Sequence, residues 1–508
     1  MLSIVKSITL HGLNGYIIEV QVDVSGGIPS LDIIGLPDAS IKEAKERVRT
    51  AIKNCGYEFP SRKIIVNLAP ASIRKSGSAF DIAIAIAILF SCGYINDFNF
   101  EKTAFLGELS LDGNVNCVNG VLPMCIEAKK LGIERIIVPK LNAKEASIVT
   151  GIDVIPVTSL KQTVSYLNKE IVINPVKFIA NESIGKVDEG IDFSDIKGQS
   201  NVKRAIEVAA SGGHNCLLIG SPGSGKTMIA KRITTILPKL TFNEALEVTK
   251  IHSIAGKVTD NNPLITTRPF RAPHHTISEI SLVGGGVVPK PGEISLAHYG
   301  VLFLDEVAEF EKRTLEMLRG PLEDGTITIG RSGGTLTYPS RFMLVMSMNP
   351  CPCGYYGSEK ECICTDVAIK KYIGKISGPL LDRIDIQVEA SSIKYNDLNS
   401  CTKEESSETI KRRVEQARLI QFNRYKNDNI FSNSELTPKL MEKYCVLNDK
   451  CKSILEKSYE KLGLSARAYG RIIKVARTIA DLDNSTSINE SHLLEAIQYR
   501  SLDKKYKL

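Results

Sequence analysis

The sequence predicts a multidomain α/β protein with a parallel sheet in its central part and a helical C-terminal part. The chain has 508 residues, enough for roughly two to four domains with separate cores. Short runs rich in β-branched residues alternate with helical stretches, as in sheets covered by helices on both faces. After about residue 400 only helical periodicity remains, which indicates a separate all-helical region.

Residues 1–172 form the first predicted domain, of the α/β or α+β kind. Helical periodicity predicts a helix within residues 38–56. Runs rich in β-branched residues predict strands at residues 16–24, 63–69, 135–140 and 152–157. The polar segment 173–192 is predicted to be a linker into the second domain.

Composition predicts a protein of the cytoplasm with no membrane partner. The apolar share of 43% and charged share of 24% are those of a globular protein. The N-terminus lacks the pattern of a signal peptide, and the longest apolar run, Ile82 to Phe90, is shorter than the roughly 20 residues that cross a bilayer. Eight cysteines are scattered singly, as expected of reduced thiols.

The net charge of +7 is concentrated at the C-terminal end of the chain. Residues 401–508 contain 21 lysines and arginines but only 15 acidic residues. This excess is compatible with a polyanionic partner such as DNA, and equally with solvated helix faces.

The segment "GSPGSGKT" fits the phosphate-loop pattern and lies between the predicted strand "NCLLI" and a predicted helix. Backbone N–H groups of such a loop surround phosphate oxygens at a helix N-terminus. Lys226 would contact the β- and γ-phosphates, and the Thr227 hydroxyl would bind Mg²⁺. The predicted ATP-binding residues are Gly220, Ser221, Pro222, Gly223, Ser224, Gly225, Lys226 and Thr227.

A pair of carboxylates follows the apolar run "VLFL", 78 residues after Thr227. Open α/β sheets bind ligands at the carboxyl ends of their strands, so Asp305 is predicted to hold Mg²⁺ and Glu306 to polarise the attacking water. Apolar strands often end in acids, so this motif has predictive value only together with the phosphate loop. Together they predict ATP hydrolysis.

Asn349 ends a second apolar run, "RFMLVMSMN", where its amide would orient the water near the γ-phosphate. The alternative is an asparagine that merely forms a turn. Arg383 in "SGPLLDRID" is a candidate arginine finger for a neighbouring subunit, or else half of a surface ion pair.

Arg467, Arg471 and Lys474 share one face of a predicted helix, while apolar residues occupy the other face. Arg467 would reach the nucleotide from a helical lid, although such a basic stripe is often only solvated. Another predicted helix in the same region begins with a capping box formed by Ser487 and Glu490.

Four of the twelve cysteines, Cys351, Cys353, Cys362 and Cys364, have the spacing C-x-C-x8-C-x-C. Four thiolates complete a tetrahedral Zn²⁺ site of the structural type. The spacing is tighter than the usual C-x₂-C, so a redox or inert cluster remains an alternative. The adjacent histidines His274 and His275 are interpreted as polar loop residues rather than metal ligands.

Residues from about 193 to 500 resemble the AAA+ ATPases of the magnesium-chelatase-like branch. The resemblance rests on "GSPGSGKT", "RPFRAPHHTISEISLVGGGVVPKPGEISLAHYGVLFLDE", "MSMNPCPCG", "SGPLLDRID" and "SARAYGRIIKVARTIADL". The N-terminal part looks like the Lon-protease C-terminal fold, through "IVNLAPASIRKSGSAFDIAIAIAIL" and "TAFLGELSLDGNVNCVNGVLPMCIEAKKLGIERIIVPK". This order of domains resembles the YifB/ComM family over essentially the whole chain.

The resemblance implies three parts: a Lon-like domain at 1–172, an AAA+ core at 193–398 that contains the four cysteines, and a helical lid at 399–508. It also implies that Asn349 is sensor 1, Arg383 the finger and Arg467 sensor 2. ComM-type proteins are hexameric ring ATPases that move DNA branches, so a homo-hexamer, DNA, ATP and Mg²⁺ are the implied partners and cofactors. The alternatives are a magnesium-chelatase-like motor subunit and an ATP-dependent protease.

One departure from Lon-type proteases concerns their serine and lysine pair. Ser78 lies near the serine position, but Leu122 stands where the lysine is expected. Because an unassisted hydroxyl is a poor nucleophile, we expect no protease activity from this domain.

Overall fold

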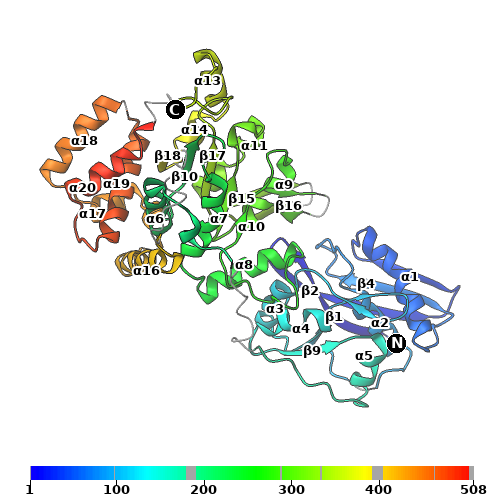
Figure 1. The fold of residues 1–508 in the computed structure, drawn as a ribbon. Coiled ribbons are helices and arrows are strands. Elements are labelled where there is room, and N and C mark those ends of the chain that lie inside the picture. Colours follow the sequence, from blue (N-terminus) through cyan, green and yellow to red (C-terminus); the bar gives the residue numbers. More distant parts are fainter. Residues whose placement is uncertain are drawn as a thin grey trace.

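The computed structural model shows three regions arranged in chain order (Figure 1). A mixed α/β domain is followed by an α/β domain with a parallel sheet and then by a helical region, in agreement with the predicted fold class. No helix in the described part of the chain combines the length and apolarity needed to span a bilayer. The structure describes residues 2–96, 98–178, 190–286, 289–331, 334–391, 404–428, 430–462 and 464–502.

The N-terminal domain is built on a seven-stranded sheet with the order β3-β4-β2-β1-β5-β8-β9. The apolar run that is too short for a membrane forms α2, whose residues Ile82–Leu89 are fully buried against the sheet. The elements are β1 (Leu2–His11), β2 (Asn14–Ser25), β3 (Ser30–Ile34), α1 (Ala39–Asn54), β4 (Lys63–Ala69), α2 (Asp81–Ser91), β5 (Thr103–Phe105), β6 (Glu108–Leu109), β7 (Val115–Asn116), α3 (Val121–Lys130), β8 (Arg135–Pro139), η1 (Lys140–Asn142), α4 (Ala143–Ser147), β9 (Asp153–Val157) and α5 (Leu160–Leu167).

The central domain contains a five-stranded parallel sheet with the order β11-β14-β17-β10-β18. Every residue of β10, β14 and β17 is buried, because helices cover both faces of the sheet. Its elements are η3 (Phe193–Asp195), α6 (Ser200–Gly212), β10 (Cys216–Gly220), α7 (Lys226–Ile236), α8 (Phe242–Ile254), β11 (Phe270–Arg271), α9 (Glu279–Val283), β12 (Gly284–Gly285), β13 (Lys290–Pro291), α10 (Glu293–Leu296), β14 (Val301–Leu304), η4 (Val307–Glu309), α11 (Lys312–Glu316), α12 (Arg319–Asp324), β15 (Thr326–Arg331), β16 (Gly334–Pro339), β17 (Met343–Met348), α13 (Asp366–Ile373), α14 (Gly378–Leu381) and β18 (Ile386–Ala390).

The predicted linker 173–192 has neither helix nor strand at residues 173–178 and 190–192, and the rest of it lies outside the described residues. The sequence patterns did not reveal the antiparallel hairpin of β15 and β16, which is inserted before β17.

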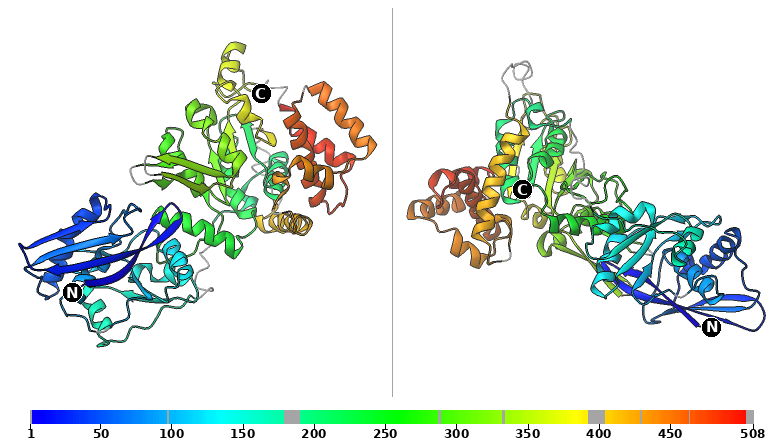
Figure 2. Two further views of the ribbon diagram at one scale, coloured as in Figure 1. Left: turned by 180° about the vertical axis from the view of Figure 1, so that it is seen from behind. Right: turned by 90° about the horizontal axis from the view of Figure 1, so that it is seen from below.

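The C-terminal helices share one hydrophobic core with a face of the central sheet. Helices α16 and α19 pack against α6, and α16 also packs against α7. Figure 2 shows the helical region on the far side of the central domain from the N-terminal domain. The elements are α16 (Ser407–Arg424), η5 (Asn433–Glu435), α17 (Pro438–Tyr444), α18 (Asp449–Leu462), α19 (Ala466–Leu482) and α20 (Glu490–Gln498).

The capping box predicted from Ser487 and Glu490 is wrong. Asn489 is the N-cap of α20, and its side chain accepts a hydrogen bond from the backbone of His492 at 3.0 Å. The imidazole of His492 in turn accepts from the backbone N–H of Asn489 at 3.2 Å. A histidine therefore takes the place of the glutamate in this motif, which shifts the helix start by two residues.

The N-terminal domain meets the central domain along α8. Leu246 and Ala245 of α8, with Leu264, pack into the apolar cluster that surrounds α3. At the centre of this contact the buried carboxylate of Glu145 accepts hydrogen bonds from Ser253 of α8 and from the backbone N–H of Leu122, the latter at 3.0 Å. Burial raises the pKa of Glu145, although these hydrogen bonds oppose the shift.

Asp385 fixes the lid helix α19 to the central sheet. Its buried carboxylate pairs with Arg471 of α19, accepts from the backbone N–H of Asn215 at 3.0 Å and lies 3.5 Å from the His214 ring. Burial alone would raise its pKa, but Arg471 and His214 hold the pKa of Asp385 well below its usual value.

We predict that Asp385→Asn destabilises the protein by about 3 kcal/mol at neutral pH, because Arg471 loses its buried partner. A carboxylate with a depressed pKa contributes stability above its usual pKa of about 3.9, and this contribution is lost as the pH falls below that value. The difference in melting temperature between wild type and variant should therefore shrink on acidification from pH 7 towards about pH 3.

The matched control is Asp382→Asn. Asp382 pairs at 3.7 Å with Arg467, whose side chain is 61% exposed. Loss of this ion pair should therefore lower the free energy of unfolding by less than about 1 kcal/mol. Equal melting temperatures for the two variants at pH 7 would contradict the anchoring role of Asp385.

Candidate nucleotide site and four-thiol site

The predicted phosphate loop connects the carboxyl end of β10 to the N-terminus of α7. Gly223 and Gly225 have φ values of 78° and 83°, a region that glycine enters without steric cost. The loop therefore turns tightly and leads directly into the first turn of α7, where unpaired backbone N–H groups favour phosphate.

The ammonium of Lys226 is folded back over this loop. It donates to the carbonyls of Gly220 at 2.7 Å and Ser221 at 3.0 Å, and to Oδ1 of Asn349 at 3.3 Å. Burial lowers the pKa of Lys226, while Asp305 and Glu306 act in the opposite direction. The site thus holds a partly desolvated cation that a phosphate group would stabilise.

Thr227 and Asp305 meet at the carboxyl ends of β10 and β14. The Thr227 hydroxyl donates to Oδ2 of Asp305 at 2.6 Å, and Oδ1 of Asp305 accepts from the buried hydroxyl of Ser347 in β17. A hydroxyl and a carboxylate oxygen side by side form a donor set that suits Mg²⁺. Ser347 was not predicted from the sequence, because a single serine inside "MLVMSM" gives no distinguishing signal.

Glu306 directly follows Asp305 and adopts a φ of 51°, which is left-handed for a residue other than glycine. Its backbone N–H donates to Ser347 at 3.2 Å, and its side chain is exposed. Such strained positions cluster at functional sites, where the surrounding structure maintains them.

Arg383 and Arg467 are not joined to these groups by hydrogen bonds or ion pairs. Arg383 donates to the carbonyl of Pro379 at 2.7 Å and pairs with Glu323 of α12. Arg467, at the start of α19, pairs with Asp382. The structure thus brings Lys226, Thr227, Asp305, Glu306 and Asn349 to one sheet edge and leaves the two arginines apart from it.

Four thiols converge in the loop that follows β17, which we call the four-thiol loop (residues 350–365). Their Sγ atoms all lie within 4.8 Å of one another. Cys351 Sγ is 3.3 Å from that of Cys353 and 3.7 Å from that of Cys362. Zn–S bonds of about 2.3 Å place tetrahedral sulfur atoms about 3.8 Å apart, so the four thiols match a zinc site in number, type and spacing.

The thiols of this loop differ in how strongly they hold their protons. A backbone hydrogen bond from Tyr355 lowers the pKa of Cys353 to about 6. A backbone hydrogen bond from Cys364 acts to lower the pKa of Cys362. Desolvation and the neighbouring thiols outweigh it and raise this pKa to about 12. A bound metal ion would favour the thiolate form, because only the thiolate is a metal ligand.

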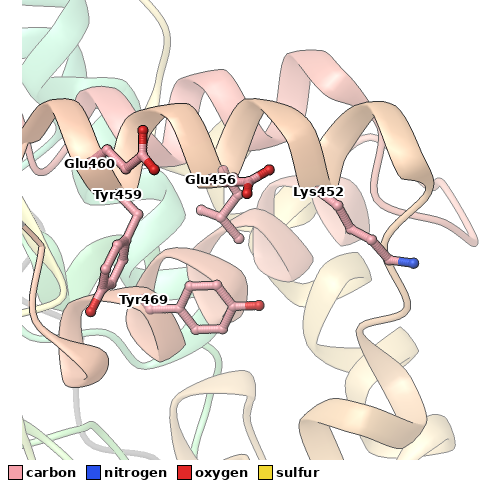
Figure 3. A pocket seen from close by; sticks show the side chains of 6 residues that line it. Lys452, Glu456, Tyr459, Glu460 and Tyr469 are labelled. Carbon is pink, nitrogen blue, oxygen red and sulfur yellow. The ribbon is translucent and has the colours of Figure 1, made fainter.

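Two further features lie outside the nucleotide site. The rings of His274 and His275 are 4.1 Å apart. Among the described residues, neither histidine belongs to a group of three or more side chains that could hold a metal ion. A hollow of about 530 Å³ between α18 and α19 is lined by acidic and aromatic side chains and includes Tyr459 and Tyr469 (Figure 3). It contains none of the predicted site residues.

The predicted serine position of the N-terminal domain lacks a lysine partner. The Ser78 hydroxyl donates to Glu108, and Leu122 is fully buried in the contact with α8. Lys75, three residues before Ser78, was not predicted to have a functional role. Its buried ammonium donates to the carbonyls of Gly35, at 3.0 Å, and Pro70, and burial lowers its pKa.

The fold and this site define the class of the protein as an AAA+ protein of the magnesium-chelatase type. The family model described as "Magnesium chelatase, subunit ChlI" matches residues 192–398, "Subunit ChlI of Mg-chelatase" matches residues 20–142, and "Magnesium chelatase, subunit ChlI C-terminal" matches residues 404–500.

Full-length relatives identify the family more closely. The chain is 41% identical to competence protein ComM of Haemophilus influenzae over 507 residues, covering 99% of this chain and 98% of the relative. It is 42% identical to YifB of Escherichia coli over 505 residues, with the same coverage of both chains. The chain therefore belongs to the ComM/YifB family.

The Lon-like character of the N-terminal region also has a counterpart. Lon protease 2 of Bacillus subtilis is 30% identical over 190 residues, which cover 34% of this chain and 33% of that protein. The predicted family and fold class are thus confirmed.

Proposed function

We propose that the protein is an ATP-hydrolysing ring motor that acts on DNA in the cytoplasm and promotes branch migration during recombination or natural transformation. The observation that carries the proposal is the convergence of Lys226, Thr227, Asp305, Glu306 and Asn349 at one sheet edge. The full-length relative ComM is named as a competence protein, which supports the proposal.

Each residue at this sheet edge has a separate role in ATP hydrolysis. Loop amides and Lys226 would hold the phosphates, and Thr227 with Asp305 would hold Mg²⁺, which neutralises charge on the phosphate oxygens when bound. The exposed carboxylate of Glu306 accepts a proton from the attacking water. Asn349, already within hydrogen-bond distance of Lys226, orients that water toward the γ-phosphate.

Arg383 supplies the finger of a neighbouring subunit in this proposal. Within its own protomer it is bound to Glu323 and only 11% exposed, away from the Lys226 cluster. A residue that must act on the next subunit's phosphate fits a closed ring, for which we propose a hexamer. Arg467 would approach the nucleotide of its own protomer from the lid.

DNA is proposed as the substrate because the C-terminal region is basic and the relative ComM is named for competence.

The N-terminal domain is proposed to be a non-proteolytic collar of the ring. Ser78 is bonded to a carboxylate, and Leu122 contributes to domain docking rather than to proton transfer.

A magnesium-chelatase-like motor is the second candidate function. All three matching family models carry the chelatase subunit in their descriptions. The two candidates share the ATPase chemistry and differ in what the motor acts on. DNA dependence of turnover therefore discriminates between them.

The DNA proposal predicts that single-stranded or branched DNA raises ATP turnover at about 50 mM salt. It also predicts that this stimulation falls steeply by about 200 mM, since phosphate contacts release counterions. Steady-state phosphate release measures it. Glu306→Gln is the control, expected to bind ATP and DNA with little turnover. Turnover that ignores DNA at low salt would contradict the DNA assignment.

The ring proposal predicts that Arg383→Ala lowers turnover by about 10³-fold while ATP still binds. Mixing Arg383→Ala with Lys226→Ala subunits should recover part of the activity, because an intact loop then meets an intact finger. Arg319→Ala, which removes another surface ion pair, is the matched control and should leave turnover unchanged. Failure to recover activity at any mixing ratio counts against a finger in trans.

We further propose that the four thiols hold Zn²⁺ in a closed structural site. Metal analysis of the purified full-length protein should then find about one zinc per chain. Cys362→Ser should reduce this content, while Cys117→Ser, at an exposed thiol outside the cluster, should not. Protein purified without chelators that contains no zinc would end this assignment.

A further inference from the structure

The four-thiol loop lies directly against the phosphate loop. At Gly354, which has a φ of 87°, a Cβ atom would lie 2.5 Å from Cδ and 2.7 Å from Cγ of Pro222. These distances are shorter than carbon atoms tolerate, so the backbone of the four-thiol loop touches the proline ring of the phosphate loop. Only glycine permits both this approach and this backbone conformation.

The same loop is continuous with the group that contacts Lys226. Asn349 precedes Cys351 by two residues, and its backbone hydrogen-bonds the phenol of Tyr372 in α13, the helix that follows the four-thiol loop. Buried Cys351 packs with Ile369 and Tyr372 in the core cluster beneath the sheet. The four-thiol loop therefore contacts the phosphate loop at Pro222 and is joined to Asn349 directly through the chain.

Regular secondary structure does not order this loop. Residues 350–365 contain no helix or strand, and residues 357–361 are exposed. Cross-links by a four-coordinate metal would supply the constraint that regular secondary structure does not, as in small metal-dependent folds.

We infer that metal bound by Cys351, Cys353, Cys362 and Cys364 positions the phosphate loop for ATP, through the contact of Gly354 with Pro222. The inference rests on the proposed ATP site and deepens it, because it assigns control of ATP affinity to a metal site outside the nucleotide pocket. It does not depend on DNA as the substrate.

Gly354→Ala tests the contact while leaving all four thiols in place. The added methyl should weaken ATP binding about ten-fold, measured by titration with a fluorescent ATP analogue, with zinc content unchanged. Gly93→Ala is the control, since Gly93 has a similar φ of 80° and no atom lies within 4 Å of the position that its Cβ would take. It should leave ATP binding unaltered.

A double variant separates contact from strain. Pro222→Ala removes the ring atoms that the new methyl group would meet, so Gly354→Ala should cost several-fold less in the Pro222→Ala background than in wild type. An equal cost in both backgrounds would overturn the contact as the route of coupling.

Metal removal tests the other half of the inference. Protein stripped with a zinc-selective chelator should bind the ATP analogue about ten-fold more weakly and recover on addition of Zn²⁺ but not of further Mg²⁺. Unchanged affinity in fully zinc-depleted protein overturns the inference. Because these assays measure ATP binding without DNA, a motor that ignores DNA would refute the proposed substrate and leave this result standing.

Discussion

The parallel register of β10, β14 and β17 determines where the chemical groups of the site lie. β17 pairs with both neighbours, with Ile219 opposite Met348 and Leu304 opposite Met346. Each strand is followed directly by a segment of the candidate site: the phosphate loop, the acidic pair and Asn349. Because parallel strands end at the same edge, three segments distant in sequence reach one point. Apolar burial on both faces keeps these three strands at the centre of the domain.

The sequence predicted those features that have local signals. The phosphate loop, the acids after "VLFL" and Asn349 are recognisable because each combines a buried strand with polar residues at its end. Ser347 and the Tyr372 phenol were not predicted, since their roles depend on which strands and helices become neighbours. The β15–β16 hairpin and the start of α20 were missed because threonine-rich and serine-rich segments also occur in loops.

The contact between the first two domains explains why Leu122 departs from the pattern of Lon-type proteases. Leu122 occupies the position expected for a lysine, and its backbone donates to Glu145, which also accepts from Ser253 across the domain boundary. A lysine side chain at this buried position would require desolvation of its charge among apolar neighbours. Docking onto α8 therefore favours leucine over a catalytic base.

The lid is attached to the segment that carries Arg383 by two ion pairs of unequal strength. Arg471 pairs with Asp385, which is 3% exposed, so separating them would leave a buried charge without its partner. Arg467 pairs with Asp382 at a largely exposed site, where such pairs contribute less than about 1 kcal/mol. Separation of Arg467 from Asp382 would therefore cost little, whereas Arg471 stays bound to Asp385. The start of α19 is thus held to the segment before β18 more weakly than its second turn.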